Sequence, residues 1–173
     1  HNSLWPANPD VLIHEFAEQH SFEHAHFQTS ASRYALDYAR RIGWRVRDDA
    51  KVVPNPLAEP KFLKQGPIDG TVPELVYFGR LETRKGLKLF VQAVKGIDPS
   101  VKLTFLGRDL PLECGQPASR WVQSQLAERN VCFLTHYDRD QALTYLASGN
   151  RLAIIPSLSE TFCHTVAECI VHG

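Results

Sequence analysis

The sequence predicts an α/β fold in which helices cover a parallel β-sheet. After residue 73, short apolar runs alternate with amphipathic stretches of helical spacing, and this pattern occurs four times in succession. Successive β–α units imply a parallel sheet with covering helices and right-handed crossovers. Before residue 74 the rhythm is irregular and polar. The 173 residues therefore indicate one domain and part of another.

The composition is that of a globular protein and does not favour a membrane or nucleic-acid partner. Hydrophobic residues make up 43% and charged residues 22% of the chain, and the mean hydropathy is −0.25. No apolar run approaches the roughly 18–20 residues of a membrane span. Lys plus Arg and Asp plus Glu both number 19, so nothing favours a nucleic-acid partner. Any use of charge must be local.

The cysteines indicate reduced thiols in a cytoplasmic protein. No C-x-x-C pair occurs, and the spacings fit neither a zinc site nor a dense disulfide framework. The N-terminus has no basic region followed by an apolar one, so no signal peptide is expected. The cysteines are Cys114, Cys132, Cys163 and Cys169.

The ends of the chain suggest a fragment or a chain with missing pieces. It starts at His1, contains no methionine, and stops at Gly173 just as a helix would be ending.

The first 56 residues are expected to hold two helices and two short strands. Asp10 is the expected N-cap of the first helix and Ser30 that of the second, which Gly43 closes. The expected helices span residues 11–19 and 32–42, and the strands residues 25–28 and 51–53. A proline- and glycine-rich linker follows at 57–73. The predicted domains are thus 1–56 and 74–173.

The regular region after residue 73 is expected to contain four strands, each followed by a helix. The strands are expected at residues 75–78, 101–106, 131–134 and 152–155, and the helices at 86–94, 118–129, 138–147 and 163–172. Ligands of such sheets bind outside the carboxyl ends of the strands. The residues immediately after each strand are therefore the functional candidates.

The loop after the first strand offers a place for a phosphate or diphosphate. Gly79 permits a tight turn and close approach of a ligand, and Arg80 and Lys85 lie five positions apart beside a helix N-terminus. The loop is not a Walker A motif. With Arg84 and Lys88, the same cations could equally form a solvated basic face. Spacing alone does not separate these two interpretations.

The second and third strand ends are less informative. Gly107-Arg108-Asp109 is interpreted as a plain turn in preference to a ligand loop. A structural role is also favoured for Thr135-His136-Tyr137 over contact with a base or sugar.

The stretch "ETFCHTVAE" (160–168) carries two acids where the fourth strand gives way to a helix. The free amides at residues 162–165 should face the same cleft as Arg80 and Lys85. A carboxylate in the first turns of a helix is also stabilised by the helix dipole, by about 0.3–1 kcal/mol. That explanation suits one glutamate. It suits an inward-facing Glu168 less well, because burying a carboxylate without a partner is costly.

Together these residues resemble family-4 glycosyltransferases, which have the GT-B fold of two facing Rossmann-like domains. "VYFGRLETRKGL" (76–87) is similar to the opening strand and loop of the C-terminal domain. "IIPSLSETFCHTVAEC" (154–169) is similar to the E-x7-E signature. "VVPNPL" (52–57) resembles the interdomain crossing, and "FQTSASRY" (27–34) the last strand and helix of the N-terminal domain. The resemblance covers most of the chain from about residue 23.

The resemblance implies transfer of a sugar from a nucleotide-diphosphate sugar (UDP-, GDP- or ADP-sugar) with retention of configuration. Arg80 and Lys85 match the pair that holds the diphosphate and stabilises charge on the leaving group. Glu160 matches the residue that orients hydroxyls of the transferred sugar, and Glu168 the one that binds the ribose. No metal is implied, because the cations replace it. The amides near the phosphates and sugar would be those of Phe162, Cys163, His164 and Thr165.

The sequence also departs from the family. Cys163 stands where glycine is common, so a side chain there could narrow the sugar pocket and change the donor. The glycine-rich and acceptor-binding parts of the N-terminal domain are missing, as are the last strand and helix. Half of a GT-B fold, truncated at its C-terminus, is expected to bind the donor without turnover. The acceptor, a glycan, lipid or small molecule, is unknown. Any peripheral membrane contact would use the missing N-terminal part.

Three other functions remain open. One is a metal site, because His14, His20, His24 and His26 occur close together, although H-E-x-x-H spacing is missing and exposed histidines are favoured. Another is a non-catalytic domain that keeps the fold. The third is a different GT-B protein, such as a sugar-nucleotide epimerase or a phosphorylase, whose pyridoxal phosphate lysine has no candidate here.

Overall fold

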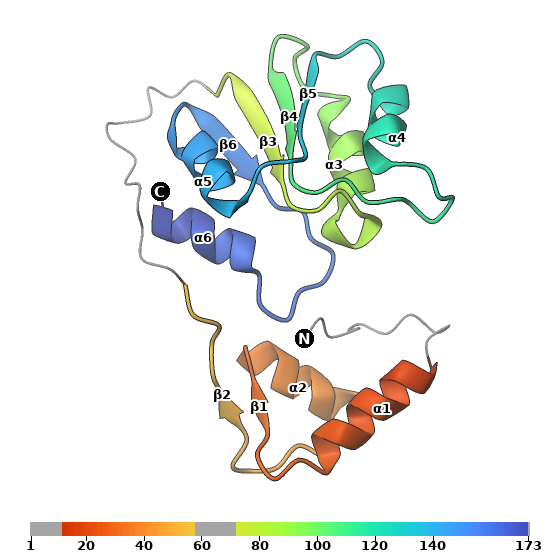
Figure 1. The fold of residues 1–173 in the computed structure, drawn as a ribbon, viewed down its shortest axis with the longest axis vertical. Coiled ribbons are helices and arrows are strands. Elements are labelled where there is room, and N and C mark those ends of the chain that lie inside the picture. The colour runs from red at the N-terminus through yellow and green to blue at the C-terminus, as the bar shows by residue number, and fades with distance from the viewer. Residues whose placement is uncertain (1–11, 58–71, 173) are drawn as a thin grey trace. The chain divides into compact units, whose positions relative to one another are not determined.

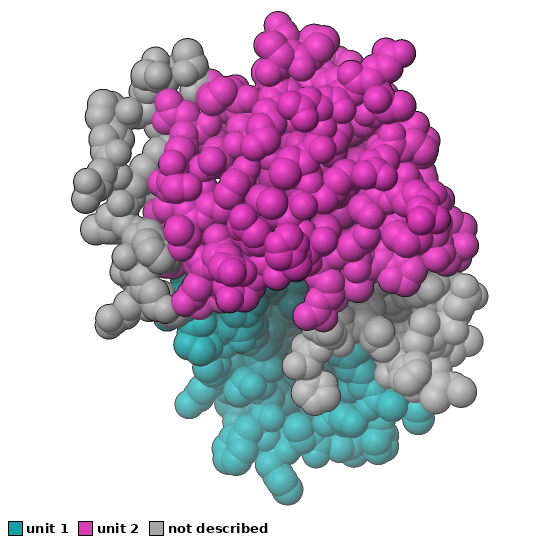
Figure 2. All heavy atoms as spheres, turned by 45° about the horizontal axis from the view of Figure 1, so that its top comes forward, with its two compact units in different colours: residues 1–57, 159–164 teal, residues 58–158, 165–173 magenta. Residues whose placement is uncertain are grey.

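The computed structural model describes residues 12–57 and 72–172 (Figure 1). By its internal contacts the chain divides into two compact units, which Figure 2 colours separately. Unit 1 comprises residues 1–57 and 159–164, and unit 2 comprises residues 58–158 and 165–173.

Unit 2 is built on a four-stranded parallel sheet in the order β5-β4-β3-β6. The strands are β3 (Glu74–Phe78), β4 (Lys102–Leu106), β5 (Val131–Leu134) and β6 (Arg151–Ile154). The helices are α3 (Leu87–Val94), α4 (Ala118–Gln125), α5 (Arg139–Ala147) and α6 (His164–His172), and the 3-10 turn η2 (Thr83–Lys85) precedes α3. Glu74 of β3 is in register with Lys102 and Arg151, so three strands begin at one level.

Helices pack on both faces of this sheet, because successive strand residues point to opposite sides. Tyr77 and Phe105 pack with α3 and α4, whereas Val76 and Leu106 pack with α5. In Figure 1, α3 and α4 lie on one side of the strands and α5 on the other. The predicted α/β fold with a parallel sheet and flanking helices is confirmed.

The apolar stripe of α3 shows how the sequence specifies this packing. Leu87, Phe90, Val91 and Val94 recur at helical spacing, and all four are at most 3% exposed. Burying a side chain of this kind contributes roughly 1.5–3 kcal/mol. The same spacing in the sequence is why the position of this helix could be predicted.

The amino end of the sheet holds a buried cluster around Glu74, which is 6% exposed. The hydroxyls of Thr104 and Tyr145 donate to Oε1 of Glu74, and Arg151 Nε donates to Oε2 at 2.7 Å. Lys102 Nζ lies 3.1 Å from Oε1. Burial raises the pKa of Glu74, but these donors together outweigh that effect and lower the pKa to about 2. The cluster keeps Glu74 ionised inside the fold.

Unit 1 contains α1 (Leu12–Glu23), β1 (Thr29–Ser30), α2 (Arg33–Arg41) and β2 (Lys51–Val52), with β1 parallel to β2. The buried side chain of Gln28 connects three segments. Its Nε2 donates to the carbonyls of Phe22 at 2.9 Å and Arg45 at 3.1 Å, and its Oε1 accepts from the Arg47 amide at 2.7 Å.

Several predicted boundaries are wrong in detail. The strand expected at residues 25–28 lies instead at Thr29–Ser30, because pairing with β2 begins only where the Lys51 amide reaches the Gln28 carbonyl. The second helix is capped by Ser32, whose Oγ accepts from the Ala35 amide at 3.2 Å, and not by Ser30. The helix expected at 118–129 ends at Gln125. The Asp10 cap lies outside the described residues.

All four cysteines are free thiols. The described residues include no helix with the length and apolarity needed to cross a membrane. Cytoplasmic location and the boundaries 1–56, 57–73 and 74–173 stay predictions, and most of the expected linker lies outside the described residues.

Candidate functional site

The strand order of unit 2 locates its candidate site. The chain runs from β3 outward through β4 to β5 and then returns to β6 on the other side of β3. This reversal makes the carboxyl ends of β3 and β6 a topological switch point, where open α/β sheets bind ligands. The predicted residues Gly79, Arg80 and Lys85 follow β3, and α6 follows β6.

The loop after β3 is anchored by the buried hydroxyl of Tyr77. This oxygen lies 2.8 Å from the Arg80 carbonyl and 3.2 Å from the Lys85 carbonyl, so its single O–H is shared between the main chain at both cationic positions, with the shorter contact to Arg80. Burial, with a contribution from the charge of Glu82, raises the pKa of Tyr77. The hydroxyl therefore remains a donor at neutral pH. Tyr77 was not among the residues selected from the sequence, where it is simply one apolar position of a strand.

Two glycines shape this loop in different ways. A Cβ on Gly79, which has φ 154°, would meet nothing within 4 Å, so open space adjoins the backbone there. A Cβ on Gly86, which has φ 75°, would lie 1.9 Å from the Pro156 carbonyl oxygen. Gly86 thus allows the loop to pack against the end of β6, and the Leu158 amide donates to the Arg84 carbonyl at 3.0 Å.

The cations of the loop fall into two groups. Arg84 and Lys88 are exposed, and Lys88 Nζ lies 3.4 Å from the exposed carboxylate of Glu113, as expected of a solvated face. Arg80 and Lys85 are half-buried, and the Tyr77 hydroxyl holds their main chain. Arg80 Nη2 lies 3.0 Å from Glu82 Oε1. The local geometry therefore distinguishes the predicted pair from its neighbours.

Glu168 of α6 is buried, as the sequence predicted, and it has a cationic partner. The residue as a whole is 8% exposed, and its Oε1 accepts from Arg139 Nε at 2.5 Å. Arg139 is the first residue of α5, which Asp138 and Gln141 begin with a reciprocal capping box. Sequence reasoning missed Arg139. The only signal was the capping sequence Asp138-Arg139-Asp140-Gln141, which places this residue just after a strand end.

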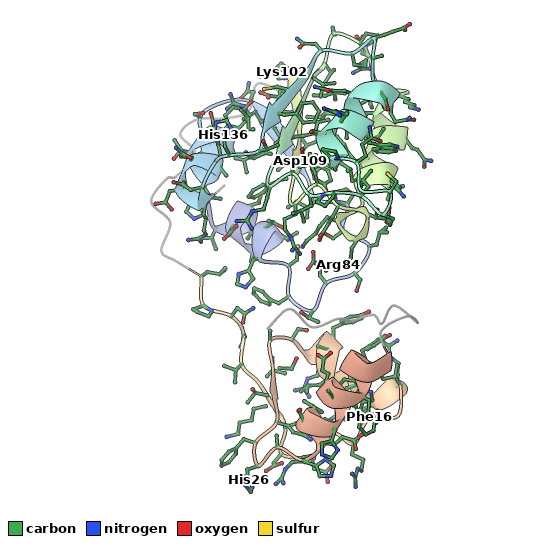
Figure 3. The ribbon with its side chains drawn as sticks, turned by 45° about the vertical axis from the view of Figure 1, so that its right-hand side comes forward. Phe16, His26, Arg84, Lys102, Asp109 and His136 are labelled. Carbon is green, nitrogen blue, oxygen red and sulfur yellow. The ribbon has the colours of Figure 1, made fainter. Side chains whose placement is uncertain are left out.

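The other strand ends have mainly structural roles. Asp109 caps the first turn of α4 although it lies ten residues earlier in the sequence. Its carboxylate accepts from the Ser119 amide at 3.0 Å and from the Ser119 hydroxyl at 2.5 Å. This agrees with the plain turn expected at Gly107-Arg108-Asp109. Tyr137 packs against the core below α5, whereas His136 is exposed (Figure 3).

Residues 159–164 belong to unit 1 by their contacts. Ser32 Oγ donates to the Thr161 carbonyl at 2.5 Å, and Asn55 Nδ2 lies 2.8 Å from His164 Nε2. The His164 amide donates to the Phe162 carbonyl at 3.1 Å. Of the predicted site residues, unit 2 therefore holds Gly79, Arg80, Lys85, Thr165 and Glu168, and unit 1 holds Glu160, Phe162, Cys163 and His164.

The histidine-rich metal site gains no support from the described residues. Among them, no group of three or more His, Cys, Asp or Glu side chains is placed to hold a metal ion. The rings of His20 and His24 stack at 4.1 Å, and Nδ1 of His24 lies 2.8 Å from the His20 carbonyl. The side chain of His14 lies outside the described residues.

Comparisons with known proteins agree with this geometry. Residues 58–173 match the family profile described as glycosyl transferases group 1. Among solved structures, the chain is similar to "lipopolysaccharide outer core galactosyltransferase WaaB apo form", with a TM-score of 0.64 and 17% identity. The match covers 86% of this chain but 41% of that one, and at this identity it shows the fold alone, that of half a GT-B protein. The search of curated proteins gives no match.

Proposed function

The chain belongs to the group 1 glycosyl transferases, and on this premise we propose that it is part of a retaining family-4 enzyme. The enzyme would transfer a hexose from a nucleotide-diphosphate sugar to an acceptor. One observation carries the proposal: at the switch point of the sheet, a buried hydroxyl fixes the loop that bears Arg80 and Lys85. The hexose type is part of this proposal and rests on the family-4 resemblance of residues 76–87 and 154–169.

Arg80 and Lys85 would hold the donor diphosphate. A cation about 4 Å from a phosphate oxygen gains roughly 4 kcal/mol at an effective dielectric constant of 20. The leaving nucleoside diphosphate gains negative charge as the bond to the sugar breaks. Preorganised cations that stabilise this charge lower the barrier. They would also take the place of a metal ion, so the proposal includes no metal cofactor.

Glu168 would bind the ribose of the nucleotide. Its Oε1 contacts Arg139, whereas Oε2 makes no hydrogen bond within the described part of the chain. A carboxylate oxygen accepts hydrogen bonds from hydroxyls, and such charge-assisted bonds are stronger than neutral ones. The open space beside Gly79 supports the approach of a ligand at the same edge of the sheet.

The segment that joins β6 to α6 would meet the transferred sugar. Glu160 would orient its hydroxyls, and the amides of Phe162, Cys163, His164 and Thr165 would lie near the sugar and phosphates. The half-buried Cys163 would then influence which sugar is accepted. The base of the donor (uracil, guanine or adenine) and the acceptor (glycan, lipid or small molecule) are left open by this proposal.

The test is calorimetric binding of UDP, GDP and ADP to the 173-residue chain. We expect one of them to bind and Lys85→Ala to weaken that binding by about 10- to 100-fold, because a charge-assisted contact is lost. Lys88→Ala is the matched control, since this lysine lies three residues away and pairs with surface Glu113. The proposal fails if none of the three binds, or if Lys88→Ala weakens binding as much as Lys85→Ala does.

A further inference from the structure

The pair formed by Arg139 and Glu168 joins two helices that follow different strands. Arg139 opens α5 after β5, and Glu168 lies one turn inside α6 after β6. The two side chains meet at 2.5 Å although 29 residues separate them. The carboxylate side chain is 10% exposed and the arginine side chain 44%. The pair is thus buried on the acidic side and open to solvent on the basic side.

The geometry of this pair is asymmetric. Arg139 uses Nε for Glu168 Oε1, and within the described residues Nη1, Nη2 and the second carboxylate oxygen make no hydrogen bond. A pair that served stability alone would gain most from a bidentate contact, in which two N–H groups meet both oxygens. Here one oxygen is held and the other remains able to accept from a ligand.

The backbone at Arg139 is also held in place. Asp138 accepts from the Gln141 amide at 2.8 Å, and the Gln141 side chain accepts from the Asp138 amide at 2.9 Å. This capping box fixes the first turn of α5, and with it the backbone from which Arg139 extends. The side chain that contacts the carboxylate of the neighbouring helix therefore extends from a fixed turn of backbone.

We propose that Arg139 is a positioning residue that orients Glu168 for the donor ribose. The inference rests on the proposed function and adds a residue to it. With Oε1 held by Arg139, Oε2 points its lone pairs at one place, where two adjacent ribose hydroxyls can donate. Without Arg139 the buried carboxylate lacks its partner and turns toward water or other donors. Arg139 would then determine the preference for ribose over deoxyribose, and not the affinity for the phosphates.

The experiment measures this preference directly. The tightest binder among UDP, GDP and ADP is compared with its 2′-deoxy form and with inorganic pyrophosphate, all by calorimetry. We expect the unaltered chain to favour the ribose form by about tenfold, the value of one charge-assisted hydrogen bond. Arg139→Gln should reduce this ratio to about twofold. Pyrophosphate binding should change by less than about threefold, since Arg80 and Lys85 are intact.

Three further variants separate positioning from folding. Arg139→Lys should recover part of the ribose preference, because a cation remains near Oε1. Glu168→Gln should lose the preference, and adding Arg139→Gln to it should change nothing more, because Arg139 acts through Glu168. The double variant removes both charges, so it also keeps the test usable if Arg139→Gln alone fails to fold. Arg120→Gln, an exposed arginine of α4, is the matched control.

The outcomes are distinct. If the unaltered chain binds no nucleotide, the proposed function fails and this inference fails with it. If a nucleotide binds and Arg139→Gln keeps the tenfold ribose preference, the inference alone is overturned. An equal loss of pyrophosphate binding would also overturn it, since Arg139 would then belong to the phosphate contacts. So would a further loss on adding Arg139→Gln to Glu168→Gln.

Discussion

At the amino end of the sheet in unit 2, two cations and two hydroxyls surround the single buried carboxylate of Glu74. At the carboxyl end, Arg80 and Lys85 are half-buried beside the open space at Gly79. Figure 3 shows Lys102 and Arg84 at these opposite ends. In the amino-end cluster the carboxylate and the cations compensate one another's charge, so we interpret this cluster as one that stabilises the fold. The carboxyl end holds the two cations to which the proposed function assigns the donor diphosphate.

The largest effect should come from breaking the amino-end cluster. Glu74→Gln keeps the shape of the side chain but leaves Arg151 and Lys102 without their carboxylate. Removing one partner of a buried pair costs about 3–5 kcal/mol, so we expect the free energy of unfolding to fall by about 3 kcal/mol in urea titrations. Glu113→Gln, an exposed acid paired with Lys88, should cost less than about 1 kcal/mol.

Nucleotide binding should not depend on the amino-end cluster. Glu74→Gln should leave nucleotide binding unchanged wherever the variant is folded, because the cluster lies at the end of the sheet away from Arg80 and Lys85. If Glu74→Gln lowers the free energy of unfolding by less than about 1 kcal/mol, the amino-end cluster does not stabilise the fold as expected. If it changes nucleotide affinity as much as Lys85→Ala does, the cluster also affects ligand binding at the carboxyl end.

The same cluster predicts a dependence of stability on pH. The folded state lowers the pKa of Glu74 from 4.5 to about 2. A lowered pKa stabilises the fold above pH 4.5, and the contribution is lost as the pH falls through 4.5 toward 2. When fully present, this contribution to the free energy of unfolding is about 3 kcal/mol, because each pKa unit corresponds to about 1.36 kcal/mol.

Chemical unfolding of the chain and of Glu74→Gln between pH 7 and pH 3 measures this contribution. The difference between the two proteins isolates Glu74 from other acids such as Glu23, whose pKa is also lowered to about 2, chiefly by the Arg45 amide. The difference should shrink as the pH falls. A difference that stays constant down to pH 3 would mean that Glu74 keeps no proton-linked advantage in the folded state.

What the sequence predicts in unit 2 is the part that depends on local periodicity. The apolar runs of β3 to β6 and the stripe Leu87, Phe90, Val91 and Val94 repeat at spacings that only a strand or a helix can bury. The loop cations could be predicted for a related reason. Residues after parallel strands gather at one edge of the sheet, whatever the loop conformation.

The rest depends on contacts between residues far apart in the sequence. Glu74 was not selected, because strand register brings Thr104 and Arg151 to it and the packing of α5 on the sheet brings Tyr145. Arg139 was missed for the same reason, as its partner lies 29 residues away. In unit 1, the Gln28 side chain bonds to two other segments of the chain. The strand there spans Thr29–Ser30 and not the expected residues 25–28. No periodicity records such contacts.

A smaller effect is expected from loosening the carboxyl end. Tyr77→Phe removes the hydroxyl that bonds the carbonyls of Arg80 and Lys85 but keeps the ring in the core. We expect a loss of about 1 kcal/mol in unfolding free energy and about three- to tenfold weaker nucleotide binding by calorimetry. Tyr34→Phe, an exposed tyrosine of α2, is the control. Equal binding by Tyr77→Phe and the unaltered chain would show that the loop does not need this anchor.

The smallest effect should come from the acid that competes with the ligand at the carboxyl end. Glu82 Oε1 lies 3.0 Å from Arg80 and 3.3 Å from Arg84, so Arg80 must exchange partners when it contacts a diphosphate. Partly exposed pairs of this kind contribute up to about 1 kcal/mol, which corresponds to at most about fivefold in affinity. Glu82→Gln should therefore bind the nucleotide about two- to fivefold more tightly at low ionic strength, and the gain should decrease as salt is added.

Glu128→Gln, which removes an exposed acid elsewhere in unit 2, should bind as the unaltered chain does. Weaker binding by Glu82→Gln would mean that this carboxylate holds Arg80 in its binding position, as Thr104, Tyr145 and the cations hold Glu74. The carboxyl end would then be a compensated cluster like the amino end. Tighter binding would show that Arg80 is only lightly held there, so its charge is available to the donor.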